Sequence, residues 1–503
     1  MIPVLSAEQV RLADAYTIAH EPIASIDLME RAAAACTRRM AEMLAANRPV
    51  VVLAGMGNNG GDGLAIARML HGNGHRVQVW VLRTRPQGSP DFEENLHRAR
   101  AIDLPVFFVE EGGTLPTAEP EALLVDALFG TGLQRPLAGW VKQVVLAVNA
   151  LPNEVVAIDL PSGLFADGND GNDAKAIVQA DRTFTLELPK MALLMADNAQ
   201  YAGAWEVVPI GLDRAFVAGV KPLAAMLEQA DAAALMPERT RVSHKGDHGH
   251  AWLLAGGPGK MGAAIMAARA CLRAGCGLLT VHVPVGQAGT MHGAVPEAIV
   301  SEDAQAVLSA LPKLGRVDAI GVGPGMGTSA EAARLLKVLV QNAPAPLVLD
   351  ADALNILAEN KTWMAFLPAG TVLTPHPGEL DRLTEKAGSS ADRLANAMEL
   401  ARRFQVVVVL KGAYTVICTP DGRTFFNSTG NPGMAKGGSG DALTGIITSL
   451  RAQGLDALSA VLLGVFAHGS AGDIAARDLG MDGMLPGDLI ERLPQAWRQL
   501  RAQ

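Results

Sequence analysis

The segment of the sequence best suited to chemistry is a glycine-rich turn, Gly437-Gly438-Ser439-Gly440-Asp441, which precedes a helical pattern over 442–450. Glycines let backbone amides converge without a Cβ in the way, and a helix N-terminus adds unpaired N–H groups and a partial positive charge. This combination predicts a binding site for a phosphoryl group or a developing anion. Asp441 could abstract a proton from a substrate hydroxyl, or it could simply cap the helix.

Three other polar segments follow predicted strands in the same half of the chain. Lys411 opens a turn after the strongest predicted strand, where it suits contact with a nucleotide phosphate. His376 follows a second strand, and Asp350 and Asp352 follow a third. Ligands of α/β sheets bind at the carboxyl ends of the strands. Each residue alone is also compatible with a cap or a turn, but together they favour a site.

The N-terminal half carries a different glycine-rich segment, Asn58-Asn59-Gly60-Gly61-Asp62, between a predicted strand and a predicted helix. A formal match to G-x-G-x-x-G begins at Gly55, but such a match is weak by itself. The acidic residue that dinucleotide-binding oxidoreductases carry about 20 positions later is missing, because the second strand runs into Arg83. A mixture of amide oxygens, a carboxylate and backbone donors suits a ligand and a hard cation together.

Two acids stand at strand ends beside further loops of this half. Asp126 precedes the loop Gly130-Thr131-Gly132-Leu133-Gln134-Arg135-Pro136, and Asp159 precedes a turn that contains Ser162. Lys190 follows another apolar run. A lone Asp at such a position is more often a turn residue, but two of them in one domain favour a site.

Short apolar runs alternate with helical patterns along the chain, which predicts parallel sheets with helices on both faces. The stretch 215–237 lacks strong strand signals, so we place a domain boundary near residue 225. Different motifs in the two halves predict fusion rather than duplication. The predicted strands are 50–54, 77–82, 123–126 and 155–159 in the first half, and 251–255, 278–283, 319–322, 347–350, 372–374 and 406–410 in the second.

Composition narrows the class of protein. The chain has 503 residues, 49% of them hydrophobic, which suffices for two or three well-packed domains. Its net charge of −9 argues against nucleic-acid binding. The four cysteines lack C-x-x-C spacing, which argues against a thiolate zinc site and predicts reduced cysteines in a cytoplasmic protein. We expect neither a signal peptide nor a membrane-spanning run.

Taken together, the C-terminal motifs resemble those of the ADP/ATP-dependent NAD(P)H-hydrate dehydratase family. The resemblance covers roughly residues 235–500 and is carried by His244-Lys245-Gly246-Asp247-His248-Gly249-His250, the glycines of 256–264, and the segments described above. It implies a ribokinase-like fold and a repair reaction. NADH and NADPH can gain water at C6 of the nicotinamide ring; the enzyme phosphorylates the resulting hydroxyl and lets phosphate leave.

The resemblance also implies roles for particular residues. Asp441 would be the base, and Gly440 with its neighbouring amides would stabilise the transferring phosphoryl group. Mg²⁺ would sit on the phosphates of ADP or ATP. The nucleotide would contact Lys411, Gly412, Ala413, Tyr414, Thr415 and Gly440, and the hydrate would contact Ala263, Gly325, His376 and Asp441.

The N-terminal motifs resemble the NAD(P)H-hydrate epimerase domain over roughly residues 1–215. That resemblance implies a Rossmann-like three-layer fold that interconverts the R and S hydrates. Asn59, Asp126 and Ser162 would coordinate K⁺, and either Asp126 or Asp159 would be the acid/base at C6. The hydrate would contact Asn58, Asn59, Gly60, Gly61, Asp62, Gly130, Thr131, Gly132, Leu133, Gln134, Arg135, Pro136 and Asp159.

The leading interpretation is a bifunctional α/β enzyme acting on the hydrates NADHX and NADPHX, with a Rossmann-like epimerase domain over 1–220 and a ribokinase-like α/β/α dehydratase domain over 225–503. We expect small-molecule partners, no nucleic acid, no membrane, and a homo-oligomer. The alternative is a ribokinase-like kinase of a small alcohol with a non-catalytic N-terminal ligand-binding module. The intact Asn58–Asp62 segment favours repair.

Overall fold

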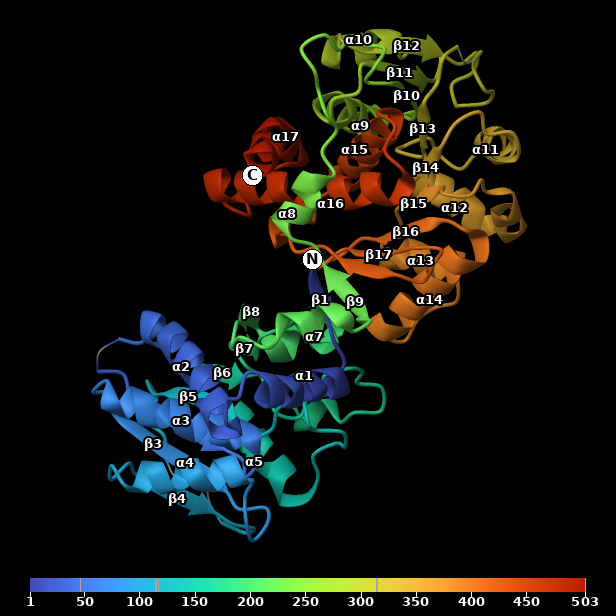
Figure 1. Cartoon of the computed structure of the whole chain (residues 1–503). Helices are drawn as coiled ribbons and strands as arrows, with labels where there is room; N and C mark the ends of the chain where they lie inside the picture. The colour runs from blue at the N-terminus through green and yellow to red at the C-terminus, as the bar shows by residue number, and fades with distance from the viewer. Residues whose placement is uncertain (46, 114, 116, 314, 503) are drawn as a thin grey trace. The chain divides into compact units, whose positions relative to one another are not determined.

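A computed structural model describes residues 1–45, 47–113, 115, 117–313 and 315–502. The chain divides into two compact units, residues 2–223 and residues 224–503 (Figure 1). Each unit has its own sheet and its own hydrophobic core.

The first unit is built on a parallel sheet with the strand order β4-β3-β2-β5-β6-β7-β8. Its central strands are buried on both faces, which explains why they read as unbroken runs of Val, Leu and Ile. The strands of this unit are β1 (Ile2–Val4), β2 (Val50–Ala54), β3 (Val77–Leu82), β4 (Val106–Val109), β5 (Leu123–Ala127), β6 (Val155–Ile158), β7 (Arg182–Leu186) and β8 (Ala204–Val208).

The strand order reverses direction between β2 and β5, because β3 and β4 extend to one side of β2 while β5 to β8 extend to the other. In open α/β sheets such a reversal leaves a crevice at the carboxyl ends of the two strands, and ligands bind there. The predicted site segments that follow β2 and β5 therefore meet at this crevice.

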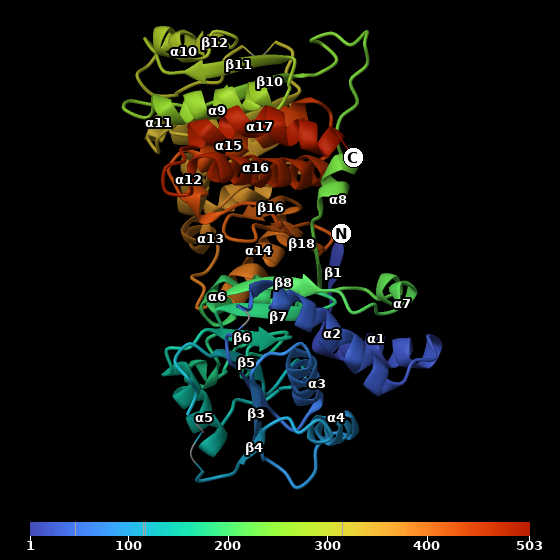
Figure 2. The same ribbon diagram turned by 90° about the vertical axis from the view of Figure 1, so that its left-hand side faces the viewer.

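Helices cover both faces of this sheet. Figure 2 shows α3 and α4 on one side of the strands and α5 on the other. Leu64 and Ile66 of α3 pack with Phe92 of α4 in one core, while Val145 and Val148 of α5 belong to the core on the opposite face. The helices of the unit are α1 (Ala7–His20), α2 (Ser25–Met43), α3 (Asn58–Gly72), α4 (Pro90–Arg100), α5 (Gly139–Asn149), α6 (Ala199–Ala202) and α7 (Arg214–Gly219).

The second unit has a larger sheet, in which β9-β18-β17-β16-β15-β14-β13-β10-β11-β12 are neighbours. Most pairs are parallel, as predicted, but β17 runs antiparallel to both β16 and β18. The strands are β9 (Ala224–Met226), β10 (His250–Leu254), β11 (Leu278–Val283), β12 (Ile299–Glu302), β13 (Ala319–Val322), β14 (Leu347–Leu349), β15 (Val372–Leu373), β16 (Val407–Leu410), β17 (Val416–Cys418) and β18 (Thr424–Phe426).

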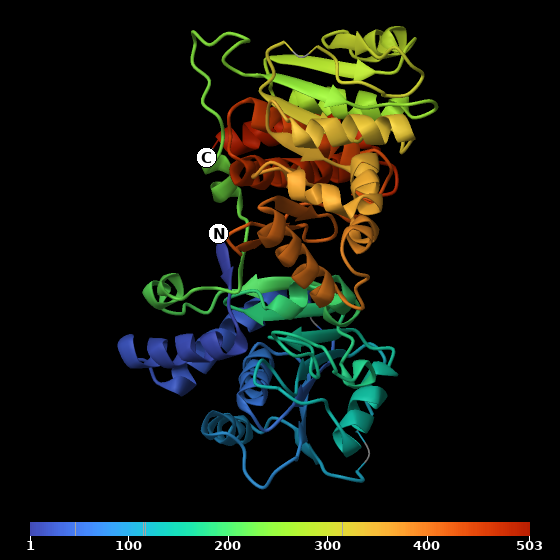
Figure 3. The same cartoon turned by 90° about the vertical axis from the view of Figure 1, so that its right-hand side faces the viewer.

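Two helical layers cover this sheet. In Figure 3 the ochre and orange helices α11 to α14 lie in front of the sheet, and the red helices α15 to α17 lie behind it. The helices are α8 (Gln229–Ala234), α9 (Met261–Arg273), α10 (Ala288–Ala294), α11 (Ala330–Gln341), α12 (Ala351–Glu359), α13 (Pro377–Leu383), α14 (Ser390–Phe404), α15 (Ser439–Ala452), α16 (Ala457–Leu479) and α17 (Pro486–Arg501).

Helix α16 is the one helix of the described residues that is long and apolar enough to cross a membrane, with a mean hydropathy of 1.4 in its most apolar window. In the structure 72% of that window is buried. Its side chains pack with those of α15 and α17 in a single core. We therefore interpret α16 as a core helix. The sequence analysis did not identify this segment as apolar enough to span a membrane.

Several predicted elements are confirmed and two details are wrong. Every predicted strand exists, with its ends within two residues of the expected positions. Asn58–Asp62, however, is not a loop: these residues form the first turn of α3. The stretch 215–237, which lacks strong strand signals, nevertheless contains the short strand β9.

Two candidate active sites

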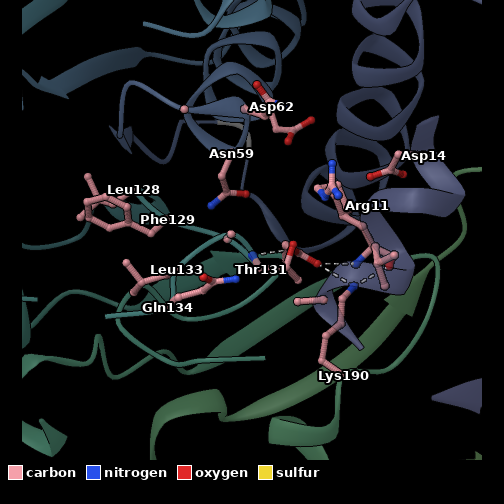
Figure 4. A pocket seen from close by; sticks show the side chains of 18 of the residues that line it. Arg11, Asp14, Asn59, Asp62, Leu128, Phe129, Thr131, Leu133, Gln134 and Lys190 are labelled. Atoms are coloured by element: carbon pink, nitrogen blue, oxygen red, sulfur yellow. Dashed lines mark hydrogen bonds and ion pairs between the residues drawn. The ribbon is translucent and has the colours of Figure 1, made fainter. Parts of the chain in front are cut away.

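The first candidate site is a cavity of about 660 Å³ in the first unit, at the carboxyl ends of β2, β5, β6 and β7 (Figure 4). A volume of this size suits a small-molecule ligand. The cavity brings together most of the residues predicted to bind the hydrate. Those that line it are Asn58, Asn59, Asp62, Gly130, Thr131, Gly132, Leu133, Gln134 and Asp159.

The other predicted residues of this unit lie outside the cavity wall, and two of them have a packing role instead. A side chain at Gly60 would collide with the carbonyl oxygen of Gly55, and one at Gly61 would approach the sulfur of Met29 to 2.7 Å. These glycines therefore let α3 pack closely against its surroundings. The predicted residues that do not line the cavity are Gly60, Gly61, Arg135, Pro136, Asp126 and Ser162.

Asp159 is held in the cavity wall by a buried ion pair. Its Oδ1 lies 2.7 Å from the Nζ of Lys190, a side chain that is only 1% exposed. Lys190 also donates to the carbonyl oxygen of Leu186, and Asp159 accepts from the backbone N–H of Thr131. Asp159 has a φ of 68°, in the left-handed region that ordinary residues rarely adopt. Such local strain recurs at functional sites.

Asp126 lies behind this wall and is completely buried. Its carboxylate accepts hydrogen bonds from the backbone N–H of Ser162 at 2.7 Å and from the Ser162 hydroxyl at 2.6 Å. Burial raises the pKa of Asp126 to about 6, and these hydrogen bonds oppose the rise. Asp126 thus links strand β5 to the turn that follows β6.

Asn59 reaches toward Asp159 across Gly130. A Cβ at Gly130 would lie 3.2 Å from Oδ2 of Asp159 and 3.4 Å from Oδ1 of Asn59. The amide nitrogen of Asn59 is buried and has no hydrogen-bond partner among the described residues. A buried polar group without a partner is costly, so this amide is available to a ligand.

Two more acids line the cavity with raised pKa values. Burial, and next the charge of Asp159, raise the pKa of Asp62 well above its usual range. The same causes raise the pKa of Asp14 on α1 to about 6. Sequence analysis missed Asp14, because its helix precedes the motifs and nothing in its local pattern places it beside β6.

The second candidate site is the N-terminus of α15 in the second unit. Gly438 precedes the helix with a φ of 108°, a conformation that favours glycine. Asp441 is the third helical residue rather than a cap. Burial raises the pKa of Asp441 to about 6; the charge of Asp350 adds to the rise and that of Lys411 opposes it.

Lys411 connects the predicted nucleotide segment to this helix. Its Nζ lies 2.8 Å from Oδ1 of Asp350 and 3.6 Å from Oε2 of Glu379, and a Cβ at Gly440 would lie 3.4 Å away. The flanking acids raise the pKa of Lys411 against the opposing effect of its burial, which is the largest single influence. Lys411 is therefore a fixed cation beside Gly440 and Asp441.

The remaining predicted nucleotide contacts follow Lys411 in the turn between β16 and β17. Gly412 and Ala413 are exposed. The hydroxyl of Thr415 donates to the carbonyl oxygen of Gly412, and the Thr415 carbonyl accepts from the backbone N–H of Asn427. The tip of this turn is thus exposed to solvent, and the hydrogen bonds of Thr415 fix its base.

Ala263 and Gly325, both predicted to contact the hydrate, lie against each other. A Cβ at Gly325 would come within 2.7 Å of the carbonyl oxygen of Lys260 and 3.1 Å of the Cβ of Ala263. Gly325 also has a φ of 65°. Only glycine fits this position without a shift of the neighbouring backbone.

His376 has a structural role that the sequence left open. It precedes α13, and its Nδ1 accepts from the backbone N–H groups of Gly378 and Glu379. Glu379 accepts in turn from the backbone N–H of His376 at 2.7 Å. The His376 side chain remains 50% exposed, so part of the ring can meet a ligand, while its Nε2 lies 3.5 Å from Oε1 of Glu379.

The sequence analysis also missed two residues that support this site. The Thr444 hydroxyl donates to Oδ2 of Asp350 at 2.7 Å. His468 on α16 lies 3.0 Å from the carbonyl oxygen of Ser439 through Nε2, and burial lowers its pKa to about 4. A neutral His468 thus fixes the first residue of α15. A polar residue inside an apolar helix could have drawn attention to each, but its long-range partner is visible only in the fold.

Comparison with known proteins agrees with this division into two units. The family described as YjeF-related protein N-terminus matches residues 25–192, and the family described as NAD(P)H-hydrate dehydratase matches residues 251–495. The second unit also resembles a solved ribokinase-like superfamily protein from Enterococcus faecalis, with 28% identity and a TM-score of 0.50, over 56% of this chain and 99% of that one. The class of the second unit is therefore a ribokinase-like α/β/α domain, as predicted.

Relatives that span both units identify the family. The bifunctional NAD(P)H-hydrate repair enzyme Nnr of Moorella thermoacetica is 38% identical over 100% of this chain and 98% of its own length. That of Thermofilum pendens is 39% identical over 94% of this chain and 92% of its own length. This chain belongs to the family of bifunctional NAD(P)H-hydrate repair enzymes, which confirms the two resemblances seen in the sequence.

Proposed function

We propose that the chain repairs hydrated NADH and NADPH at two sites. The domain over 1–220 interconverts the R and S hydrates, and the domain over 225–503 dehydrates the S hydrate at the expense of ADP or ATP. Family membership supports both activities. The observation that carries the proposal is the position of Asp441 in the first turn of a glycine-led helix, where burial also raises its pKa to about 6.

Asp441 acts as the base for the dehydration. Its carboxylate takes the proton of the 6-hydroxyl, and the oxygen attacks the terminal phosphoryl group of the nucleotide. The N–H groups at the start of α15 stabilise the negative charge that develops there. The ring nitrogen's lone pair then expels phosphate from C6, and loss of a proton from C5 restores the dihydronicotinamide.

The substrates occupy opposite sides of this carboxyl. Lys411, with Gly412, Ala413, Tyr414, Thr415 and Gly440, holds the nucleotide phosphates. Ala263, Gly325 and the exposed edge of His376 contact the hydrate together with Asp441. The close packing of Gly325 on Ala263 supports a shared surface for these two residues.

Mg²⁺ fits this site as a partner of the nucleotide. Mg²⁺ prefers a few carboxylates together with substrate phosphates over an all-protein cage. Asp350 and Glu379, whose oxygens already lie around Lys411, could supply such carboxylates. The ion would neutralise charge on the phosphates during transfer.

In the first unit we assign hydrate binding to the predicted residues that line the cavity, which are Asn58, Asn59, Asp62, Gly130–Gln134 and Asp159, and K⁺ binding to Asn59, Asp126 and Ser162. An all-oxygen donor set suits a hard cation, and the Ser162 hydroxyl lies 2.6 Å from Oδ1 of Asp126. The ion would orient the hydrate's hydroxyl. Replacing K⁺ with choline should then slow epimerisation and leave dehydration of the S hydrate unchanged; equal rates in both salts would remove K⁺ from the account.

The test of the proposed function is product analysis on the full chain. Mixed R and S hydrates incubated with ADP or ATP and Mg²⁺ should give NADH and free phosphate in equal amounts, with both epimers consumed. A ribokinase-like kinase would instead leave a stable phosphoester. Accumulation of a phosphorylated hydrate without NADH would contradict the proposal.

We also propose a cytoplasmic setting and a homo-oligomeric state. Cys36, Cys271, Cys276 and Cys418 are all free and buried, which suits a reducing compartment. Light scattering on the purified chain tests the oligomer directly, and a mass of 52.5 kDa would mean a monomer.

A further inference from the structure

We propose that Asp14 on α1 is a second catalytic acid–base residue of the first site and works with Asp159 on C6 of the hydrate. This inference rests on the assignment of hydrate epimerisation to the cavity of the first unit. It concerns a residue that lies outside every motif of the sequence.

Helix α1 holds Asp14 in a fixed position. Ser6 and Gln9 form a reciprocal capping box at the start of the helix. On the inner face Ala13 is fully buried, and the Thr17 hydroxyl donates to the Ala13 carbonyl while accepting from the backbone N–H of Asp213 at 2.9 Å. Asp14 follows Ala13 directly, so the packing of α1 fixes the backbone of Asp14 at the cavity wall.

The carboxyl of Asp14 is free to meet a ligand. It lines the cavity and is half-buried, and no described residue donates a hydrogen bond to it. Asp159, in contrast, is held by Lys190 and by backbone N–H groups. Figure 4 shows Asp14 and Arg11 on one side of the cavity, with Leu133 and Gln134 on the other. The two acids thus approach the cavity from different elements, α1 and the end of β6.

Inversion at C6 needs two proton-transferring groups. One acid protonates the departing hydroxyl while the C6–O bond breaks and the lone pair of the ring nitrogen forms the N1=C6 bond, releasing water. A base on the other side takes a proton from the incoming water as its oxygen bonds to C6 and the N1=C6 electron pair returns to nitrogen. No oxidant or reductant is required. Asp14 and Asp159 must together carry one proton, so that one of them is the acid and the other is the base.

The charges around Asp14 suit this shared proton. Asp159 and Glu187 favour the protonated form of Asp14, while Lys190 stabilises the charged form; Asp62 and Arg11 line the same cavity, and Arg11 pairs with Glu8. Burial and the charge of Asp159 raise the pKa of Asp14 to about 6, so its acid form is available near neutrality. Epimerisation should therefore slow as the pH rises above this pKa.

The experiment measures interconversion of purified R and S hydrates by the full chain without nucleotide. Asp14→Asn should lower kcat at least about 100-fold, the usual contribution of a general acid or base, with little change in KM, and should remove the high-pH decline. Asp14→Ala should regain part of its rate on addition of formate, which the wild type should not. Asp27→Asn, the same change at an exposed site on α2, is the matched control and should behave as wild type.

Two results would overturn the role of Asp14. One is a rate of Asp14→Asn within about threefold of the wild-type rate. The other is a loss of rate that formate does not restore in Asp14→Ala and that keeps the high-pH decline, which would mark a structural role. Absence of interconversion in the wild type would instead refute the proposed function of the cavity.

Discussion

Both candidate sites place a lysine beside a carboxylate, in two different settings. In the first unit the lysine, Lys190, is 1% exposed, and its partner Asp159 lines the wall of the cavity. In the second unit Lys411 is 20% exposed and stands at the open end of a sheet. Epimerisation moves only protons and water at C6, so its lysine can stay buried behind the residue that meets the substrate. Phosphoryl transfer must admit a nucleotide, so its lysine must be reachable.

The largest expected effect is on the second site. Asp441→Asn removes the base for phosphorylation, and recovery of NADH absorbance from the S hydrate should fall by about 10³-fold. The variant should still interconvert R and S hydrates at the wild-type rate, which serves as an internal control. Near-normal dehydration would remove Asp441 from the chemistry.

The first site should depend on the buried ammonium group of Lys190. Lys190→Met leaves Asp159 buried without its counter-charge, which costs about 3–5 kcal/mol and should lower the unfolding midpoint of the first unit while abolishing epimerisation. Lys142→Met, which breaks a pair with Asp173 at the surface, should leave the transition nearly unchanged. Calorimetry on both variants measures the two unfolding midpoints. Equal shifts would show that the buried Lys190–Asp159 pair stabilises the unit no more than the surface pair does.

The pH dependence should reveal the base of the second site. The pKa of Asp441 is raised to about 6, so its basic form is lost as the pH falls through that value. The kcat/KM for dehydration should therefore drop tenfold per pH unit below about 6. A carboxyl at its ordinary value would keep the rate level to about pH 4, and such a profile would exclude Asp441 as the essential base.

The smallest effect concerns the hydrate surface of the second unit. Gly325→Ala and Gly327→Ala both introduce a side chain at positive φ, but only the first would meet neighbours, at 2.7 Å from the Lys260 carbonyl oxygen. Gly325→Ala should raise the KM for the hydrate several-fold and destabilise the unit by about 1–3 kcal/mol more than its control. Equal effects of the two changes would mean that backbone strain alone matters.

The sequence predicted the sheets well because their strands are buried on both faces. Val50–Ala54 is a continuous apolar run, and Leu123–Ala127 is apolar except for Asp126; neither has an exposed residue, and such runs are easily recognised. The antiparallel strands β17 and β18 have three residues each, too few for a pattern to be distinctive. The first turn of α3 was mistaken for a loop, because its two glycines disfavour a helix by propensity while tertiary packing requires them.

The candidate sites were predictable only where their residues lie within motifs. Asp441 and Asp159 stand in glycine-rich turns after strands or before helices, which local reasoning can identify. Asp14 reaches the first cavity through the packing of α1, and His468 reaches the second site from the middle of an apolar helix. No local pattern encodes such long-range placement, so both needed the fold.

The most direct test of two separate sites is an epimer-resolved time course with the full-length Asp159→Asn variant, mixed R and S hydrates, Mg²⁺ and ADP or ATP. Division of labour between the units predicts that the S hydrate disappears at the wild-type rate while the R hydrate persists. Equal slowing of both epimers would contradict it, because a single site would then serve both reactions.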